Sequence, residues 1–198
     1  MRARKVTIVV TAAVAAVMIL GAARAESTGV DTGKMVEDGA EKVERAEMQF
    51  GGKRDVEFAE ALWTAMDGYH DWMMQSDIIP GKSPHGNFVR LYYNIVNVDG
   101  KPFHVIVKDN FGGEDVTLDA VKAAPMDHLM AVTPMAQREQ GYDDENNNWF
   151  YAKYDASGAL SRNDSDTFLA GRVAKGMPAG CIACHVKAAD GDYLFTND

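Results

Sequence analysis

The chain has 198 residues and a formal net charge of −9, because 29 acidic residues stand against 20 basic ones. An acidic balance of this size makes nucleic acid an unfavourable partner, since a phosphate backbone attracts basic surfaces. Only two cysteines are present, and they are separated by two residues. This count and spacing exclude the disulfide framework that holds many small exported proteins together.

The first 25 residues predict a signal peptide. Residues 1–5 are basic, residues 6–23 are apolar or small, and Ala23-Arg24-Ala25 is the small-x-small pattern that a signal peptidase recognises. The apolar run is short for a membrane span, and the alternative is an uncleaved anchor. We therefore expect a periplasmic protein with no stable membrane span. Residues 26–198 are long enough for a single domain and carry 16 basic residues against 29 acidic ones.

The first part of the exported chain predicts helices. Residues 35–48 are compatible with a first helix. From Val56 to Met74, apolar residues recur at intervals of three and four, which is the pattern of an amphipathic helix that ends before Ile79-Pro80-Gly81. The apolar face of this predicted helix consists of Phe58, Leu62, Met66, Tyr69 and Met73.

The apolar period then changes to two, which predicts strands. Residues 88–95 and 103–108 form two such stretches on either side of the turn signal Asp99-Gly100, so we expect a hairpin. Two further strands are predicted at residues 129–133 and 149–154. The fold class is therefore α+β, with N-terminal helices, a mainly antiparallel sheet and a C-terminal segment that carries the motif described next.

Near the C-terminus, Cys181-Ile182-Ala183-Cys184-His185 is a C-x-x-C-H motif. Its spacing lets two thiols add to the two vinyl groups of one haem while the adjacent imidazole binds the iron, which predicts covalent haem c with Cys181 and Cys184 as attachment points and His185 as iron ligand. A thioredoxin-like dithiol is the alternative, but it would open a helix near the start of its fold. A zinc site would need further ligands, and no cysteine remains to supply one.

The other side of the iron has no evident ligand in the sequence. Neither methionine nor histidine follows His185, and Met177 lies too close to Cys181 to cross the ring. The remaining methionines in suitable segments occupy apolar positions that suit the core, namely Met126, Met130 and Met135. We therefore expect an open or water-filled distal site, which binds or transforms small ligands rather than only passing electrons.

Several short stretches, in this order, resemble the cytochrome P-460 family, whose characterised members are periplasmic haem enzymes that oxidise hydroxylamine and whose relatives include the β-sheet cytochromes c′. The resemblance covers roughly residues 85–198. The stretches are His85-Gly86-Asn87-Phe88-Val89-Arg90, Tyr93-Asn94, Val105-Ile106-Val107-Lys108, Asn148-Trp149-Phe150-Tyr151, the haem motif, and Asp192-Tyr193-Leu194-Phe195-Thr196.

The resemblance implies a homodimer of mainly antiparallel fold and a haem cross-linked to a strand lysine, which corresponds to Lys108 here. The alternative is that Lys108 is an ordinary strand-end lysine facing water. One departure from the family is notable: its active enzymes tend to place a carboxylate over the distal face from the segment before the haem motif, and residues 174–178 contain no acid.

Other residues are candidates for a base or for the haem propionates. Removal of a proton from a bound substrate needs a base within hydrogen-bond reach, and Glu114, Asp115 and His104 are the nearest in sequence. His104 is the best of these, because a regular strand brings it onto the face that carries Lys108. His85 and Arg90 are candidates for holding a haem propionate.

Two functions follow from the sequence. The first is an oxidoreductase that acts on hydroxylamine or a related small nitrogen species and delivers electrons to a redox partner cytochrome. The second is a non-catalytic haem protein of the same fold that binds nitric oxide or carbon monoxide as a scavenger or sensor. A plain electron carrier requires a sixth iron ligand that the sequence does not reveal.

Overall fold

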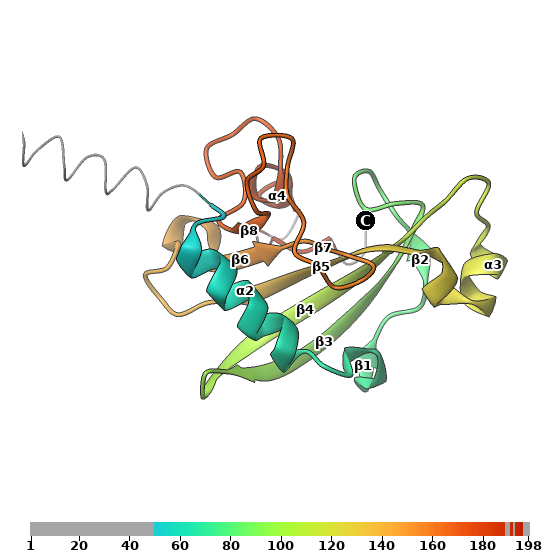
Figure 1. Ribbon diagram of the computed structural model, residues 1–198, viewed down its shortest axis with the longest axis horizontal. Coiled ribbons are helices and arrows are strands. Elements are labelled where there is room, and N and C mark those ends of the chain that lie inside the picture. The colour runs from blue at the N-terminus through green and yellow to red at the C-terminus, as the bar shows by residue number, and fades with distance from the viewer. Residues whose placement is uncertain (1–49, 189–190, 192, 196–198) are drawn as a thin grey trace, which may run out of the picture.

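The structure is a computed structural model that describes residues 50–188, 191 and 193–195. The predicted signal peptide and the helix predicted at residues 35–48 lie outside these residues. Within the described part of the chain, no helix is long and apolar enough to cross a membrane. The fold is α+β, with a helix before an antiparallel sheet and a short helix after it (Figure 1), which confirms the predicted fold class.

The described elements form one sheet with short helices around it. The sheet has eight strands in the order β1-β3-β4-β5-β6-β8, with β2 also paired to β3 and β7 to β5. In chain order, the elements are α2 (Lys53–Ala65), η1 (Tyr69–Asp71), β1 (Met74–Gln75), β2 (Ile79–Pro80), β3 (Phe88–Val98), β4 (Lys101–Phe111), α3 (Leu118–Ala123), η2 (Pro125–His128), β5 (Leu129–Gln137), η3 (Asp144–Asn146), β6 (Trp149–Ala152), β7 (Tyr154–Asp155), β8 (Ala170–Gly171) and α4 (Cys181–His185).

The hairpin of β3 and β4 is the centre of the sheet. Its register runs without interruption from Phe88 opposite Phe111 to Val98 opposite Lys101. Asp99 and Gly100 join the strands with φ angles of 51° and 78°, the positive values that a tight two-residue hairpin turn requires. The predicted hairpin is therefore confirmed, and its strands extend beyond the predicted bounds, to Val98 and Lys101 at the turn and to Phe111 at the far end.

The predicted helix of residues 56–74 is shorter than expected. α2 ends at Ala65, and Gly68 adopts a φ of 71°, a left-handed conformation that stops a helix at low cost. Leu62 and Met66 are buried as predicted, as is Tyr69 in the following turn. Met73 was expected on the same apolar face, but this is wrong: its side chain is 98% exposed, because the chain has left the helix before it.

The alternation of side chains along β4 separates two environments. Phe103, Val105 and Val107 point to the face that α2 covers, where they belong to the largest core cluster. Ile106 lies on the other face and packs in a second cluster, which includes Ile182 of α4. Figure 1 shows α2 along the sheet and α4 near β6 and β8. One face therefore holds a conventional core, and the other holds the C-x-x-C-H segment.

A buried carboxylate anchors the face that α2 covers. Asp109 of β4 is fully buried and accepts hydrogen bonds from the Tyr69 hydroxyl at 2.6 Å and the Tyr92 hydroxyl at 3.3 Å. His70 Nε2 lies 2.9 Å from Asp109 Oδ2, the oxygen that also accepts from Tyr92. Burial, together with the charge of Asp109, raises the pKa of Tyr69 and raises that of Tyr92 to about 12, so both remain hydroxyl donors. This network ties η1 to the hairpin.

We expect Tyr69→Phe to lower the free energy of unfolding by about 1–3 kcal/mol, because the buried carboxylate loses its shortest donor while the ring is kept. Chemical denaturation of the holoprotein measures this. Tyr93→Phe is the matched control, since no hydrogen bond from the Tyr93 hydroxyl is found in the described part of the chain, and it should change stability by less than about 0.5 kcal/mol. Equal effects of the two variants would contradict the role given to Asp109.

Candidate haem site

The C-x-x-C-H motif forms one helical turn. α4 spans Cys181–His185, so the three functional side chains follow one another within a single turn of helix. Both cysteines are free; Cys181 is half-buried and Cys184 is exposed. A hydrogen bond connects this turn to the segment that follows β8: the Ile182 N–H donates to the Val173 carbonyl at 3.2 Å. The two thiols and the imidazole therefore come from one short, anchored segment.

The orientation of His185 is fixed by the chain that follows it. His185 is buried, and its Nδ1 lies 2.6 Å from the Tyr193 carbonyl oxygen. A carbonyl only accepts, so Nδ1 carries the hydrogen and Nε2 carries the lone pair, which is the tautomer that a metal ligand needs. Burial also lowers the pKa of His185, which favours this neutral form. Tyr193 has a φ of 68°, a left-handed value uncommon for a residue with a side chain.

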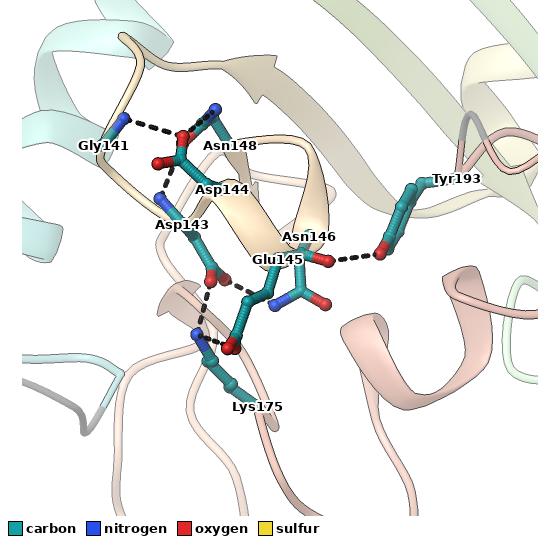
Figure 2. Close-up of polar contacts among 8 residues, drawn as sticks. All are labelled: Gly141, Asp143, Asp144, Glu145, Asn146, Asn148, Lys175 and Tyr193. Atoms are coloured by element: carbon teal, nitrogen blue, oxygen red, sulfur yellow. Dashed lines mark hydrogen bonds and ion pairs between the residues drawn. The ribbon is translucent and has the colours of Figure 1, made fainter.

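A polar network holds this C-terminal segment against the loop between β5 and β6 (Figure 2). The Tyr193 hydroxyl donates to the Glu145 carbonyl at 2.8 Å. Lys175 forms ion pairs with buried Asp143 and, at 3.2 Å, with Glu145. Asn146 donates to the second Asp143 oxygen at 2.8 Å, so both oxygens of that buried carboxylate are satisfied. Segments on both sides of the haem motif are thus tied to one loop.

A hollow lies between the motif and the sheet, and it opens to solvent. Its walls are mainly apolar. The lining residues are His85, Leu91, Ile106, Lys108, Thr133, Pro134, Met135, Tyr151, Ala152, Cys181, His185, Leu194 and Phe195. None of the described Asp and Glu residues lines the hollow.

Lys108 is the unusual residue in this hollow. It is half-buried, and no hydrogen bond or ion pair to its ammonium group is found in the described residues. Burial lowers its pKa, and only the nearby Cys184 acts in the opposite direction. Such surroundings favour the neutral amine more than water does, and the neutral amine is the nucleophilic form. The structure thus places the predicted lysine beside the haem motif.

The residues present fit a covalently attached haem. Two free thiols, an imidazole with an available Nε2 and a mainly apolar hollow are the groups that a haem c requires. The Tyr151 hydroxyl is buried and has no hydrogen-bond partner among the described residues, and its ring lies 5.4 Å from the His185 ring. A buried hydroxyl without a partner is costly, so this donor also points to a further group in the site.

Two other predicted site residues, His104 and Arg90, are not brought into the hollow. His104 shares the face of β4 with Lys108, as expected, but it is exposed and lines a separate surface depression with Arg138 and Glu139. Arg90 lies opposite Asp109 in the ladder and so points to the face that α2 covers, away from His185. The side-chain alternation that brings Lys108 to the haem side therefore turns Arg90 away from it.

The methionines considered as axial ligands are divided by exposure. Met126 and Met130 are more than half exposed, whereas Met135 is buried and lines the hollow. His85, which the sequence offered as a candidate for a haem propionate, also lines the hollow, with its ring centre 6.2 Å from that of His185.

A C-x-x-C-H turn packed beside an antiparallel sheet is the arrangement expected of a c-type cytochrome built on a sheet. The family model for Cytochrome P460 matches residues 66–196. The chain belongs to the cytochrome P460 family, which implies c-type haem. No curated protein and no solved structure gives a significant match to the chain.

We expect Lys175→Met to lower the free energy of unfolding by about 1–3 kcal/mol, because buried Asp143 loses its cationic partner. Hydrogen exchange should also become faster in residues 172–188. Lys187→Met is the matched control, since Lys187 is exposed and no ion pair to it is found in the described residues. If both variants behave alike in denaturation and exchange, the ion pair does not hold the segment.

Proposed function

We propose that the protein is a periplasmic mono-haem c-type cytochrome that oxidises hydroxylamine or a related small nitrogen species. The observation that supports this most strongly is Lys108, which is half-buried beside Cys184 and His185 and has no partner among the described residues, in a chain of the cytochrome P460 family. Haem, when bound, supplies an iron that accepts electrons from a coordinated nitrogen species. The residues of the chain attach, orient and shield that group.

Each of these residues has a distinct part in the proposal. Cys181 and Cys184 hold the haem by thioether bonds, and His185 binds the iron through Nε2, with Tyr193 fixing the ring. Lys108 would carry an additional covalent bond to the haem, in which one hydrogen of the amine and one hydrogen of the macrocycle are replaced by a C–N bond and two electrons pass to an external oxidant. The apolar walls of the hollow exclude water, which strengthens every charge interaction inside it.

The surroundings of the protein are part of the same proposal. A redox partner cytochrome removes the electrons, and the acidic exported chain suits a partner with a basic surface. Residues 1–25 direct the chain to the periplasm. The homodimer that the family resemblance implies stays a prediction.

The alternative function is binding of nitric oxide or carbon monoxide without turnover. One observation favours it: no carboxylate of the described residues lines the hollow, so the base found in active relatives has no counterpart there. A gas-binding protein needs neither that base nor the lysine bond.

Denaturing mass spectrometry with peptide mapping tests the covalent structure. We expect the tryptic peptide that contains Lys108 to be joined through haem to the peptide that contains Cys181 and Cys184. Lys108→Met should keep the haem on the two cysteines alone, whereas Lys101→Met, an exposed change in the same strand, should leave the cross-link intact. Haem held only by the cysteines in the wild-type protein would contradict the role of Lys108 and favour the gas-binding function.

A steady-state assay with hydroxylamine and an artificial electron acceptor tests the reaction. We expect turnover by the wild-type holoprotein and a decrease of about tenfold or more in Lys108→Met, because the lysine bond tunes the macrocycle. Lys101→Met should retain wild-type turnover. Absence of turnover in a fully cross-linked wild-type protein, together with tight binding of nitric oxide, would establish the alternative instead.

A further inference from the structure

A second lysine points to the side of the sheet that carries the haem motif. Lys153 lies between β6 and β7, and its neighbours Ala152 and Tyr154 both belong to the core cluster under α2. Side chains alternate along an extended chain, so Lys153 points to the opposite face. Tyr151, two residues earlier, points to that same face and packs on the His185 ring. No pattern in the sequence singles out Lys153.

The sheet register sets Lys153 in one row with Lys108. Thr133 of β5 is opposite Lys108 of β4. On the other side of β5, the pairing of Val132 with Tyr154 places Thr133 beside Lys153. The two lysines therefore flank one threonine on the same face of the sheet. Their backbones are two strand spacings apart, or about 10 Å, so they can hold two different parts of one large ligand.

Lys153 has no anionic partner in the described part of the chain. It is half-buried, and no hydrogen bond or ion pair to its ammonium group is found there. The nearest acid on the same face, Asp155, is held by its own turn, where it accepts from the Ser157 hydroxyl at 2.6 Å. The charge of Lys153 acts on Cys181 and on His85, which both line the hollow, so its ammonium group lies close to that site. A half-buried cation in this position favours a ligand with an anionic group.

The residues predicted to hold a haem propionate do not supply this charge. Arg90 points to the face that α2 covers. The Asn110 Nδ2 donates to the Lys108 carbonyl at 2.9 Å, so its Oδ1 is the acceptor end, and it lies 2.8 Å from His85 Nδ1. Burial lowers the pKa of His85 to about 4, so the ring is neutral at neutral pH and its Nε2 only accepts. A carboxylate also only accepts, and His85 therefore does not hold one.

We propose that the ammonium group of Lys153 forms an ion pair with one propionate carboxylate of the haem. The inference rests on the haem site of the proposed function and adds a residue that neither the motif nor the family resemblance identifies. Lys108 and Lys153 then hold the macrocycle by different bonds, one covalent and one ionic. A cation near the iron also favours the form of the haem with less positive charge, so Lys153 favours reduction of the iron.

The test observes the two haem carboxylates directly in the holoprotein. Labelling both carboxylates with a stable carbon isotope gives one NMR signal for each in the diamagnetic ferrous carbon monoxide complex, and each signal titrates separately. We expect Lys153→Met to make one carboxylate bind its proton at least about tenfold more tightly, because the cationic partner is lost. Lys153→Arg should keep the wild-type titration. Lys101→Met is the matched control, since it removes the same charge from the exposed start of β4 and should change neither titration.

The midpoint potential of the iron provides a second readout. With its carboxylates ionised, Lys153→Met should have a lower potential than the wild type, because uncompensated negative charge stabilises ferric iron. The difference should persist at high salt, since a half-buried pair is screened less than exposed charges are. If Lys153→Met does not accumulate, Lys153→Gln replaces it and the wild type decides as well: one of its two carboxylates should bind a proton at least about tenfold more weakly than the other.

Four results would overturn the inference: unchanged titrations in Lys153→Met, an equal change in Lys101→Met, two wild-type carboxylates of equal proton affinity, or a carboxylate that responds to Lys108→Met and not to Lys153→Met. These outcomes are separate from the test of the proposed function. A protein that oxidises hydroxylamine with carboxylates indifferent to Lys153 would refute only the role of Lys153. Carboxylates that depend on Lys153 in a protein without turnover would refute only the proposed reaction.

Discussion

The hydrogen bond between His185 Nδ1 and the Tyr193 carbonyl is the contact on which the site depends. It decides which ring nitrogen is available, and it sets the direction in which that nitrogen points. The carbonyl is in turn placed by a left-handed backbone at Tyr193 and by the hydroxyl of the same residue, which is bound to the Glu145 carbonyl. Tyr193 thus orients His185 through its backbone carbonyl, and the Tyr193 side chain holds that backbone in place.

The β3–β4 ladder provides the second half of the site. Because side chains alternate, neighbouring residues of β4 serve opposite purposes: Lys108 faces the hollow, while Asp109 is buried under α2 with Tyr69. Asn110 returns to the haem side and holds His85. A shift of the ladder by one residue would exchange these environments and bury the ammonium group among the core residues. The register is therefore a functional constraint as well as a structural one.

The sequence was sufficient for the features that depend on local patterns. The haem motif, the hairpin with its Asp99-Gly100 turn and the haem-side position of Lys108 follow from spacing, turn chemistry and family resemblance. Features that depend on pairing between distant segments could not be predicted from the sequence. Arg90 turns away because it lies opposite Asp109, a pairing that no local pattern specifies. The place of His85 depends on Asn110, 25 residues further along the chain.

The charges in the hollow suggest why the site is incomplete without its prosthetic group. The described lining contains an amine and two imidazoles but no carboxylate, and Lys108 has no partner among the described residues. A half-buried ammonium group without a counter-charge is unfavourable, and most proteins avoid it. A haem in the hollow would reduce this imbalance, because its propionates are anionic. Lys108 is costly in the polypeptide alone and would become more favourable beside such a group.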